Sequence, residues 1–535
     1  MLARSLASTV RFRTQIRCIS ALPVKNDLDP RHQQAAEHEE ERQENVRDLL
    51  VNLMNTSPSK RELHHFLKRY VPQPELTSHI ASGSSSIGQA PSLAGARSPR
   101  EYVNALLTPS GRQIAVTKVE GPFEKRGWQS VASTLLKLQR LGLTSIVVTD
   151  NPQWSLSETP SEINKTMIRE SMALVEAIEK AGGRARPIYS GVLERGSSPG
   201  SLRVNLDFVN SALENRQIPV LVPIMSTESG LQQPITANDT MIALSKELSD
   251  RKSTPSKIVL INNEGGIPNH ERIGTAHSLV NLQEEYDTIA SAFEQNPEWQ
   301  RSYPTTMRNL DMIRTCLAQL PTSSSAVIAP TSSLPSALIT NLVTDKPLYS
   351  SSLPNSDIQR INRLRTTVLR HGIKINTHTS LDGLQLNRLT ELMEASFQKK
   401  LDEDGFYARL RKALASVIVA GDYEGAVIMT KEQGKHAQHY YLDKFAIAPS
   451  SQGIGLTDIL WKRMCDAYPE LLWRSRQDNG VNKWYFERSN GYWRLKGTNW
   501  VLFWHGPKGF QHIEDYATIA RSIPASFAPP KPKKH

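Results

Sequence analysis

The sequence predicts an α/β protein with two folded domains, and three observations support this class. At 535 residues, the chain is longer than one hydrophobic core usually organises. In the first half, short apolar runs alternate with longer segments of helical periodicity, which is typical of a parallel sheet covered by helices. Further along, a strand runs directly into a glycine-containing turn and a helix, which indicates a second α/β unit.

The first domain is predicted to occupy residues 100–350. Its short apolar runs are read as strands at residues 113–119, 145–149, 219–225 and 257–262. Apolar residues recur at three- and four-residue intervals between these runs, which predicts helices at residues 127–141, 165–180 and 239–248. A Ser-rich turn near residue 350 ends the domain.

The second domain is predicted to occupy residues 360–525. It opens with a helix over residues 384–397, followed by a hairpin that turns through Gly421 and Asp422 between strands 416–419 and 424–430. A strand at 440–448 leads to a helix whose core face carries Leu456, Ile459, Leu460 and Met464. The aromatic run 500–504 is read as a late strand.

The two ends of the chain differ in composition from the domains. Before Asp27 there is no carboxylate, while five cations stand among Ser and Thr residues. This favours a mitochondrial transit peptide over residues 1–20 and a matrix location, the alternative being a basic tail without a targeting role. Residues 30–99 are read as a polar helical segment with a flexible linker, and residues 526–535 as a basic Pro-Lys tail.

Composition excludes several classes of protein. No apolar run approaches the roughly 18 to 20 residues of a membrane span. The net charge of +11 falls to about +6 without the N-terminal cations, which gives no reason to expect nucleic-acid binding. Cys18, Cys316 and Cys465 form no CxxC pair, so neither a disulfide framework nor a zinc site is expected, and no metal is predicted.

The turn after the strand at 440–448 carries the strongest chemical signal. A tight turn at a helix N-terminus directs backbone N–H groups and the helix dipole at one point, where a pyrophosphate can bind. Glycines let the ligand approach the backbone closely. The alternative is a turn that merely joins two elements. The residues concerned are Gln452, Gly453, Ile454, Gly455, Leu456 and Thr457.

This segment resembles the acetyl-CoA loop of the GNAT acetyltransferase superfamily, although Thr457 departs from the last glycine or alanine of that pattern. The sequences at 441–445, 471–476 and 484–486 extend the resemblance to the catalytic domain of vertebrate and fungal N-acetylglutamate synthases, over residues 380–510. More weakly, residues 260–267 resemble the amino-acid-kinase-like domain of that family. The implied fold is an amino-acid-kinase-like parallel sheet with covering helices, followed by a GNAT domain.

The resemblance implies transfer of acetyl from acetyl-CoA to L-glutamate. A dicarboxylate needs cations, which Lys444, Arg474 and Arg476 supply. By resemblance, Lys444, Phe445, Arg476 and Asn479 line the glutamate site, with Arg474, Asn482 and Lys400 as further candidates. The alternative for each charged residue is an ordinary surface ion pair.

The expected reaction is direct transfer without an acyl-enzyme. Backbone N–H groups from Phe445 to Ile447 would polarise the thioester carbonyl, and Ile447 is counted with the acetyl-CoA loop. By resemblance, Tyr485 protonates the departing thiolate, the alternative being an aromatic packing residue.

The first domain is expected to lack kinase activity. The turn at residues 117–122 has a single glycine, and Glu120 adds negative charge where phosphates would lie. The resemblance implies inhibition by L-arginine through this domain. The alternative is a structural domain that holds a homo-oligomer together or binds acetylglutamate kinase. Two alternatives stay open: a GNAT enzyme for a different amine, and a non-catalytic regulatory subunit of acetylglutamate kinase.

Overall fold

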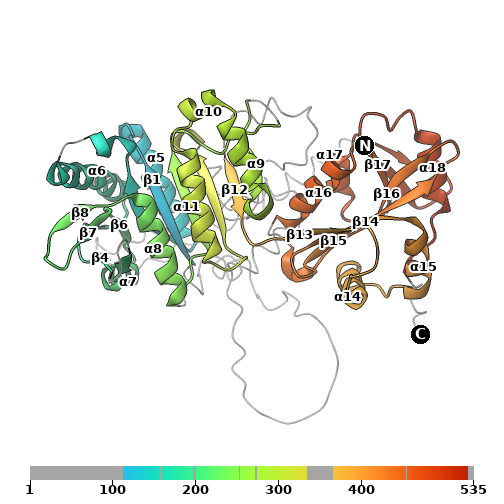
Figure 1. Ribbon diagram of the computed structural model, residues 1–535, viewed down its shortest axis with the longest axis horizontal. Helices are drawn as coiled ribbons and strands as arrows, with labels where there is room; N and C mark the ends of the chain where they lie inside the picture. The colour runs from blue at the N-terminus through green and yellow to red at the C-terminus, as the bar shows by residue number, and fades with distance from the viewer. Residues whose placement is uncertain are drawn as a thin grey trace, which may run out of the picture. The chain divides into compact units, whose positions relative to one another are not determined.

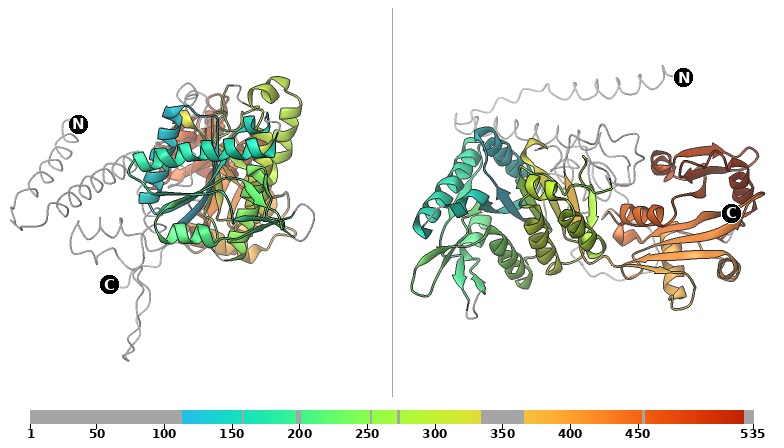
Figure 2. Two further views of the ribbon diagram at one scale, coloured as in Figure 1. Left: turned by 90° about the vertical axis from the view of Figure 1, so that its left-hand side faces the viewer. Right: turned by 45° about the horizontal axis from the view of Figure 1, so that its top comes forward.

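The computed structural model describes residues 113–156, 159–196, 201–251, 253–271, 274–333, 366–452 and 455–527. The segments predicted for residues 1–20 and 30–99 lie outside these ranges, as do residues 528–535 of the predicted tail. Figures 1 and 2 show two larger sheets, each with its own helices. Among the described helices, none is long and apolar enough to cross a membrane.

The first large sheet has eight strands in the order β10-β12-β11-β9-β1-β2-β6-β3. β11 pairs antiparallel with β12, and the other described neighbours pair in parallel. Its central strands are almost entirely buried, because helices cover a parallel sheet on both faces. The strands are β1 (Gln113–Glu120), β2 (Leu143–Asp150), β3 (Ala185–Ile188), β6 (Ile218–Leu221), β9 (Lys257–Asn262), β10 (Leu279–Asn281), β11 (Ser325–Pro330) and β12 (Thr367–Arg370).

Helices flank this sheet, and their apolar stripes form its core. Val116, Ile146 and Leu260 of the strands pack in one cluster with Leu244 and Leu310 of the helices. The described helices are α5 (Lys125–Arg140), α6 (Pro160–Lys180), α7 (Asp207–Glu214), α8 (Ala237–Asp250), α9 (Leu282–Glu294), α10 (Pro297–Ser302) and α11 (Thr306–Ala318), with short 3₁₀ turns η1 (Pro152–Leu156) and η2 (Thr331–Ser333). The predicted parallel sheet with covering helices is confirmed.

The single strand predicted at residues 219–225 is wrong. The run divides at Pro223 into β6 of the large sheet and β7 of a separate four-stranded sheet. Proline has no N–H to donate to a strand ladder, so the strand is interrupted at Pro223. The Pro223 carbonyl accepts a hydrogen bond from the N–H of Ile235. The small sheet consists of β4 (Leu193–Arg195), β5 (Leu202–Val204), β7 (Ile224–Ser226) and β8 (Gln232–Pro234).

The second large sheet has seven strands in the order β13-β14-β15-β16-β17-β19-β18. The predicted hairpin is confirmed, because β14 and β15 pair antiparallel across the turn at Gly421. The strands are β13 (Ile375–His378), β14 (Leu414–Ala420), β15 (Gly425–Gln433), β16 (Gln438–Ile447), β17 (Leu471–Arg476), β18 (Gly491–Arg494) and β19 (Trp500–His505). The helices are α14 (Leu386–Phe397), α15 (Glu403–Ala413), α16 (Leu456–Ala467), α17 (Asn482–Arg488) and α18 (Ile513–Ser522), with a 3₁₀ turn η4 (Pro449–Ser451).

Candidate active site

Strands β16 and β17 diverge in the middle of the second sheet. They run parallel and pair at one position, Tyr441 with Leu472, whereas each pairs extensively with its outer neighbour. Beyond that position, the two facing edges have no described ladder between them. Backbone groups in such a place need other partners, and a bound substrate can supply them.

A β-bulge at Asp443 decides which side chains face each side of the divergence. Ile428 of β15 pairs with Lys444 and Met429 pairs with Leu442, so Asp443 is the extra residue. A bulge breaks the regular alternation of side chains along a strand. Asp443 and Lys444 therefore point to the same face, toward α15 and the segment after α18, while Phe445 lies on the opposite face.

Three cations gather on the α15 and α18 side of β16 and β17, and we call them the cationic cluster: Lys444, Arg409 and Arg474. The Lys444 Nζ lies 2.5 Å from Asp443 Oδ1 and 3.0 Å from Ser526 Oγ. The Lys444 side chain is 9% exposed. Burial, with Arg409 and Arg474 nearby, lowers the pKa of Lys444 to about 7.

Arg409 and Arg474 are both held in place by acceptors. Arg409 of α15 forms ion pairs with Glu432 and with Asp443. Arg474 of β17 donates to the Ala520 and Ile523 carbonyls at the C-terminal end of α18, and its guanidinium lies 4.2 Å from the centre of the Trp500 ring. A guanidinium there satisfies carbonyls that a helix end leaves unpaired.

The other predicted substrate residues lie at the end of β17 and after α14. Arg476 is half-exposed and pairs with Asp478 at 3.0 Å. Asn479 donates to Ser475 Oγ, and Asn482 donates to the Arg476 carbonyl, which fixes the turn between β17 and α17. Lys400 is exposed and pairs with Glu394. The structure therefore does not bring Lys400 into the cationic cluster.

The opposite face of the divergence is aromatic. Phe445 of β16 packs 6.1 Å, between ring centres, from both Trp461 of α16 and Trp484 of α17. Tyr485 of α17 packs against Trp473 of β17 at 5.5 Å. Burial, with a smaller contribution from Tyr441, raises the pKa of Tyr485 above its ordinary value. Its hydroxyl therefore keeps its proton at neutral pH, and the raised pKa makes it a weaker proton donor than an ordinary tyrosine.

The glycine turn leads into α16 on the aromatic side. Gly455 has a φ of +82° directly before Leu456, which is buried at the start of the helix. That conformation suits glycine and leaves Thr457 within the first turn. Gln452 is described in extended conformation, whereas Gly453 and Ile454 lie outside the described residues. The N–H of Ile447, at the end of β16, donates to Ser396 Oγ at 3.2 Å.

Sequence reasoning missed three residues around Lys444: Arg409, Asp443 and Ser526. Arg409 lies on a helix that was not predicted, and Ser526 was assigned to the tail. Asp443 stands beside Lys444 in the sequence, where regular alternation would place the two side chains on opposite faces. An acidic residue inside a largely apolar and aromatic strand was the available signal, and the structure buries its carboxylate.

Known proteins are similar to this chain both over its second domain and over most of its length. A family model described as the N-acetyltransferase of N-acetylglutamate synthase matches residues 376–524. The amino-acid acetyltransferase, mitochondrial, of Laccaria bicolor is 35% identical over 90% of this chain and 100% of the relative. The chain belongs to the mitochondrial amino-acid acetyltransferase family. The relative of the same name in Coprinopsis cinerea is 32% identical over 88% of this chain and 89% of its own length.

Membership of this family makes the chain a mitochondrial acyltransferase that uses acetyl-CoA as co-substrate. Among solved structures, N-acetylglutamate synthase from Neisseria gonorrhoeae, in complex with coenzyme A and N-acetyl-glutamate, is 11% identical with a TM-score of 0.45. That match covers 74% of this chain and 95% of the other. The predicted fold class is confirmed as an α/β chain in which a largely parallel sheet with covering helices is followed by an N-acetyltransferase domain.

A polar network lies at the C-terminal ends of the strands of the first sheet. The Lys118 Nζ lies 2.6 Å from Glu120, 2.8 Å from Asp150, and 2.7 Å from both Asn238 and Asn309. Lys118 and Glu120 are buried. Burial opposes ionisation of Glu120, but Lys118 holds the pKa of that carboxyl below its usual value. Every partner of the Lys118 ammonium is thus an oxygen of the chain itself.

A second carboxylate occupies the start of α11 beside this network. The Glu264 side chain accepts hydrogen bonds from the Thr305 N–H at 3.1 Å and from the hydroxyls of Thr305 and Thr306. A helix N-terminus is where a phosphate would otherwise be held. Burial raises the pKa of Glu264 despite these bonds. Both anion-binding features of this edge are therefore used internally.

Proposed function

We propose that this amino-acid acetyltransferase acetylates the amine of L-glutamate, giving N-acetyl-L-glutamate and CoA, as in the first step of arginine biosynthesis. One observation carries the proposal: the divergence of β16 and β17 separates a cationic face from an aromatic face that adjoins the start of α16. Cations suit a dicarboxylate on one side, and a helix N-terminus suits the pyrophosphate of CoA on the other.

This arrangement assigns a role to each face. The uncharged amine attacks the thioester carbon between the strands, the carbon–sulfur bond breaks, and the proton of the amine passes to solvent. Tyr485 supplies the proton that the CoA thiolate takes up, while Lys444 and Arg476 orient the glutamate carboxylates. Backbone N–H groups near Ile447 are the proposed donors to the oxyanion, and the Ile447 N–H would exchange Ser396 Oγ for that oxygen.

Acceptor selectivity tests the proposal. Thiol release from acetyl-CoA would be followed with L-glutamate and with a panel of L-aspartate, L-glutamine and L-lysine. Glutamate should be favoured, and Arg476→Ala should raise the KM for glutamate by about 10-fold or more, because a charge-assisted contact is lost. Arg411→Ala, an exposed arginine of α15, is the matched control. A preference for another amine would replace glutamate with that acceptor.

Tyr485→Phe should lower kcat by about 10-fold and leave the KM for glutamate unchanged, because a thiolate is a good leaving group that needs little help from an acid. Steady-state rates over a range of glutamate concentrations would measure this. Tyr492→Phe serves as control, since that tyrosine is exposed on β18. An unchanged kcat in Tyr485→Phe would assign Tyr485 to aromatic packing alone.

We also propose that the first domain regulates the enzyme by binding L-arginine and transfers no phosphate. The internal use of Lys118 and of the α11 N-terminus supports this view, since neither remains available to a nucleotide. The same domain is the proposed contact for a homo-oligomer and for acetylglutamate kinase. Addition of L-arginine to the glutamate assay should inhibit the full chain.

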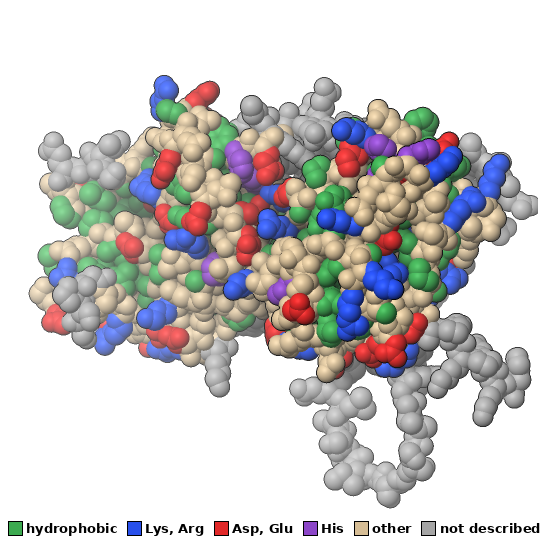
Figure 3. Space-filling model, turned by 45° about the vertical axis from the view of Figure 1, so that its right-hand side comes forward, with side chains coloured by type: hydrophobic (Ala, Val, Ile, Leu, Met, Phe, Trp, Pro, Cys, Tyr) green, Lys and Arg blue, Asp and Glu red, His purple; other side chains and the backbone are tan. Residues whose placement is uncertain are grey.

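Positive charge does not gather in a single patch on the face of the described residues shown in Figure 3. On the face shown in Figure 3, Lys and Arg side chains are interspersed with Asp and Glu side chains. A dispersed distribution of this kind gives little electrostatic reason to propose a nucleic-acid partner.

A further inference from the structure

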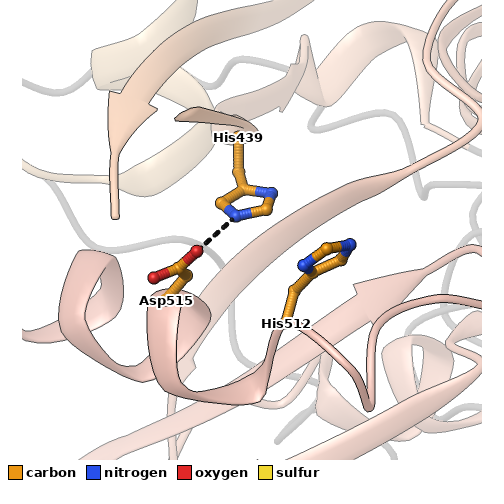
Figure 4. Close-up of side chains that lie close together, drawn as sticks. All are labelled: His439, His512 and Asp515. Carbon is orange, nitrogen blue, oxygen red and sulfur yellow. Dashed lines mark hydrogen bonds and ion pairs between the residues drawn. The ribbon is translucent and has the colours of Figure 1, made fainter. Parts of the chain in front are cut away.

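Three side chains with metal-binding atoms meet at one end of α18, apart from every residue that acetyl transfer uses. They are His439 near the start of β16, His512 directly before α18, and Asp515 in the first turn of that helix. Their ligand atoms all lie within 4.8 Å of one another. Figure 4 shows the two imidazoles side by side, with the carboxylate of Asp515 facing His439.

The surrounding structure holds two of these side chains firmly. Asp515 is buried and accepts hydrogen bonds from the backbone N–H groups of His436 and Ala437 at 2.8 and 3.1 Å, and from His439 Nε2 at 2.9 Å. His439 also packs edge-to-face on Tyr516 at 5.0 Å. A carboxylate and an imidazole with fixed orientations are half of a preorganised metal site.

His512 is the adjustable member. Its ring lies 4.8 Å from that of His439, between centres, and it is only partly buried. As the residue before α18, it makes no side-chain hydrogen bond to the start of the helix. Its ring contacts in the described structure are with His439 and, at 6.1 Å between centres, with Tyr516, and a metal ion would give its ring nitrogen a further role.

We propose that His439, His512 and Asp515 form a Zn²⁺ site that joins the β15–β16 hairpin to helix α18. Two imidazoles and one carboxylate, with a fourth position open to water, form a common ligand set for zinc. The sequence predicts no zinc site and no metal, so this proposal departs from that prediction, and the proposed ion takes no part in acetyl transfer. The ligands come from two distant segments of the sequence, since His512 follows His439 by 73 residues, so no local motif indicates the site.

The distances are those of a site that needs a small adjustment. Zinc binds nitrogen and oxygen at about 2.0 to 2.2 Å, so two ligand atoms of a tetrahedral site are separated by about 3.3 Å. His439 Nε2 and Asp515 Oδ2, at 2.9 Å, are close to that separation. Zinc would replace the hydrogen bond between them, and a rotation of the His512 side chain would complete the set.

Charge at the site is compatible with a cation. The positive end of the α18 dipole opposes a cation, so a compensating anion is needed. Asp515 accepts three hydrogen bonds, from His439 Nε2 and from the backbone N–H groups of His436 and Ala437, which suit a carboxylate in its charged form. Glu514 lies on the same turn, but it is already paired with Lys435 at 3.3 Å.

Zinc titration of the full-length chain, freed of any polyhistidine tag and of chelators, tests the inference. Competition against a chromophoric chelator should give one zinc per chain for the wild type. His512→Ala should weaken the affinity by about 100-fold, since a first ligand matters at least as much as an orienting partner. His378→Ala is the matched control, because that partly buried histidine lies on β13, outside the site.

Cobalt provides a measurement that does not depend on affinity alone. Co²⁺ added in place of zinc should give visible absorption bands typical of nitrogen and oxygen ligation, and these should disappear in both His512→Ala and His439→Ala. Circular dichroism would establish that the variants remain folded. Absence of stoichiometric zinc in the wild type, or zinc binding that His512→Ala leaves intact, would overturn the inference and leave His439 and Asp515 as a hydrogen-bonded pair.

Discussion

The Lys444→Met variant is expected to lose about 100-fold in kcat/KM for L-glutamate, because in the proposed function its buried ammonium binds a substrate carboxylate, and such a contact contributes several kcal/mol. Methionine preserves the approximate length of the side chain, while the ammonium that lies 5.0 and 5.7 Å from the ring centres of Phe406 and Phe527 is lost. Asp443 retains Arg409 as a partner, so the fold should survive. Steady-state assays against glutamate would measure the loss.

The pH profile distinguishes a charge effect from a packing effect. The pKa of Lys444 is lowered to about 7, so the ligand-free enzyme loses this positive charge as the pH rises through that value. The glutamate amine becomes reactive by losing a proton, which makes kcat/KM rise with pH. In the wild type, the rise should level off above about pH 7, whereas Lys444→Met should show no such break.

Lys431→Met is the matched control for this pair of experiments. Lys431 lies on the adjacent strand β15, is exposed, and extends over the ring of Tyr440. Its replacement should leave both kcat/KM and the pH profile unchanged. A profile that keeps its break in Lys444→Met would mean that another group titrates, and it would remove Lys444 from the substrate site.

The sequence was sufficient to predict the order of the elements near the site, because each has a strong local signal. The strand at 440–448, the glycine turn and the helix from Leu456 all appear in the structure with shifts of a few residues. Periodicity and turn chemistry are local properties, and they need no knowledge of distant residues.

The arrangement of side chains around Lys444 could not be predicted in the same way. Regular alternation would group Tyr441, Asp443 and Phe445 on one face, and the bulge at Asp443 changes this by one position. Lys444 and Phe445, predicted to line one site, therefore lie on opposite faces of β16. The roles assigned to Tyr485, Arg476 and the other site residues stay predictions.

Residues far apart in the chain posed the same difficulty. Arg409 reaches Asp443 from α15, and His512 reaches His439 from the start of α18. Neither helix was predicted, because amphipathic helices rich in polar residues give a weak periodic signal. Contacts of this kind depend on how the elements pack, which a single sequence does not show.

Lys118→Met is expected to lower the free energy of unfolding of the first domain by about 3 to 5 kcal/mol, since it leaves buried carboxylates without their cation. Glu120 is 3% exposed and cannot recover hydration. Urea unfolding, followed by hydrogen exchange of the β1 amides, would resolve the first domain from the second. Lys180→Met is the control, since that exposed lysine forms only a surface ion pair within α6.

The double variant Lys118→Met with Glu120→Leu separates the cost of an unpaired charge from the value of the pair. Replacement of both partners by apolar groups should recover much of the lost stability, because a buried ion pair contributes little beyond mutual compensation. If Lys118→Met alone were as stable as the wild type, Asn238 and Asn309 rather than the ammonium would hold this edge together. If Lys118→Met destabilises the first domain and the double variant does not, Lys118 serves to neutralise the carboxylates of the chain itself. In a kinase, a lysine at such a place would instead contact phosphate.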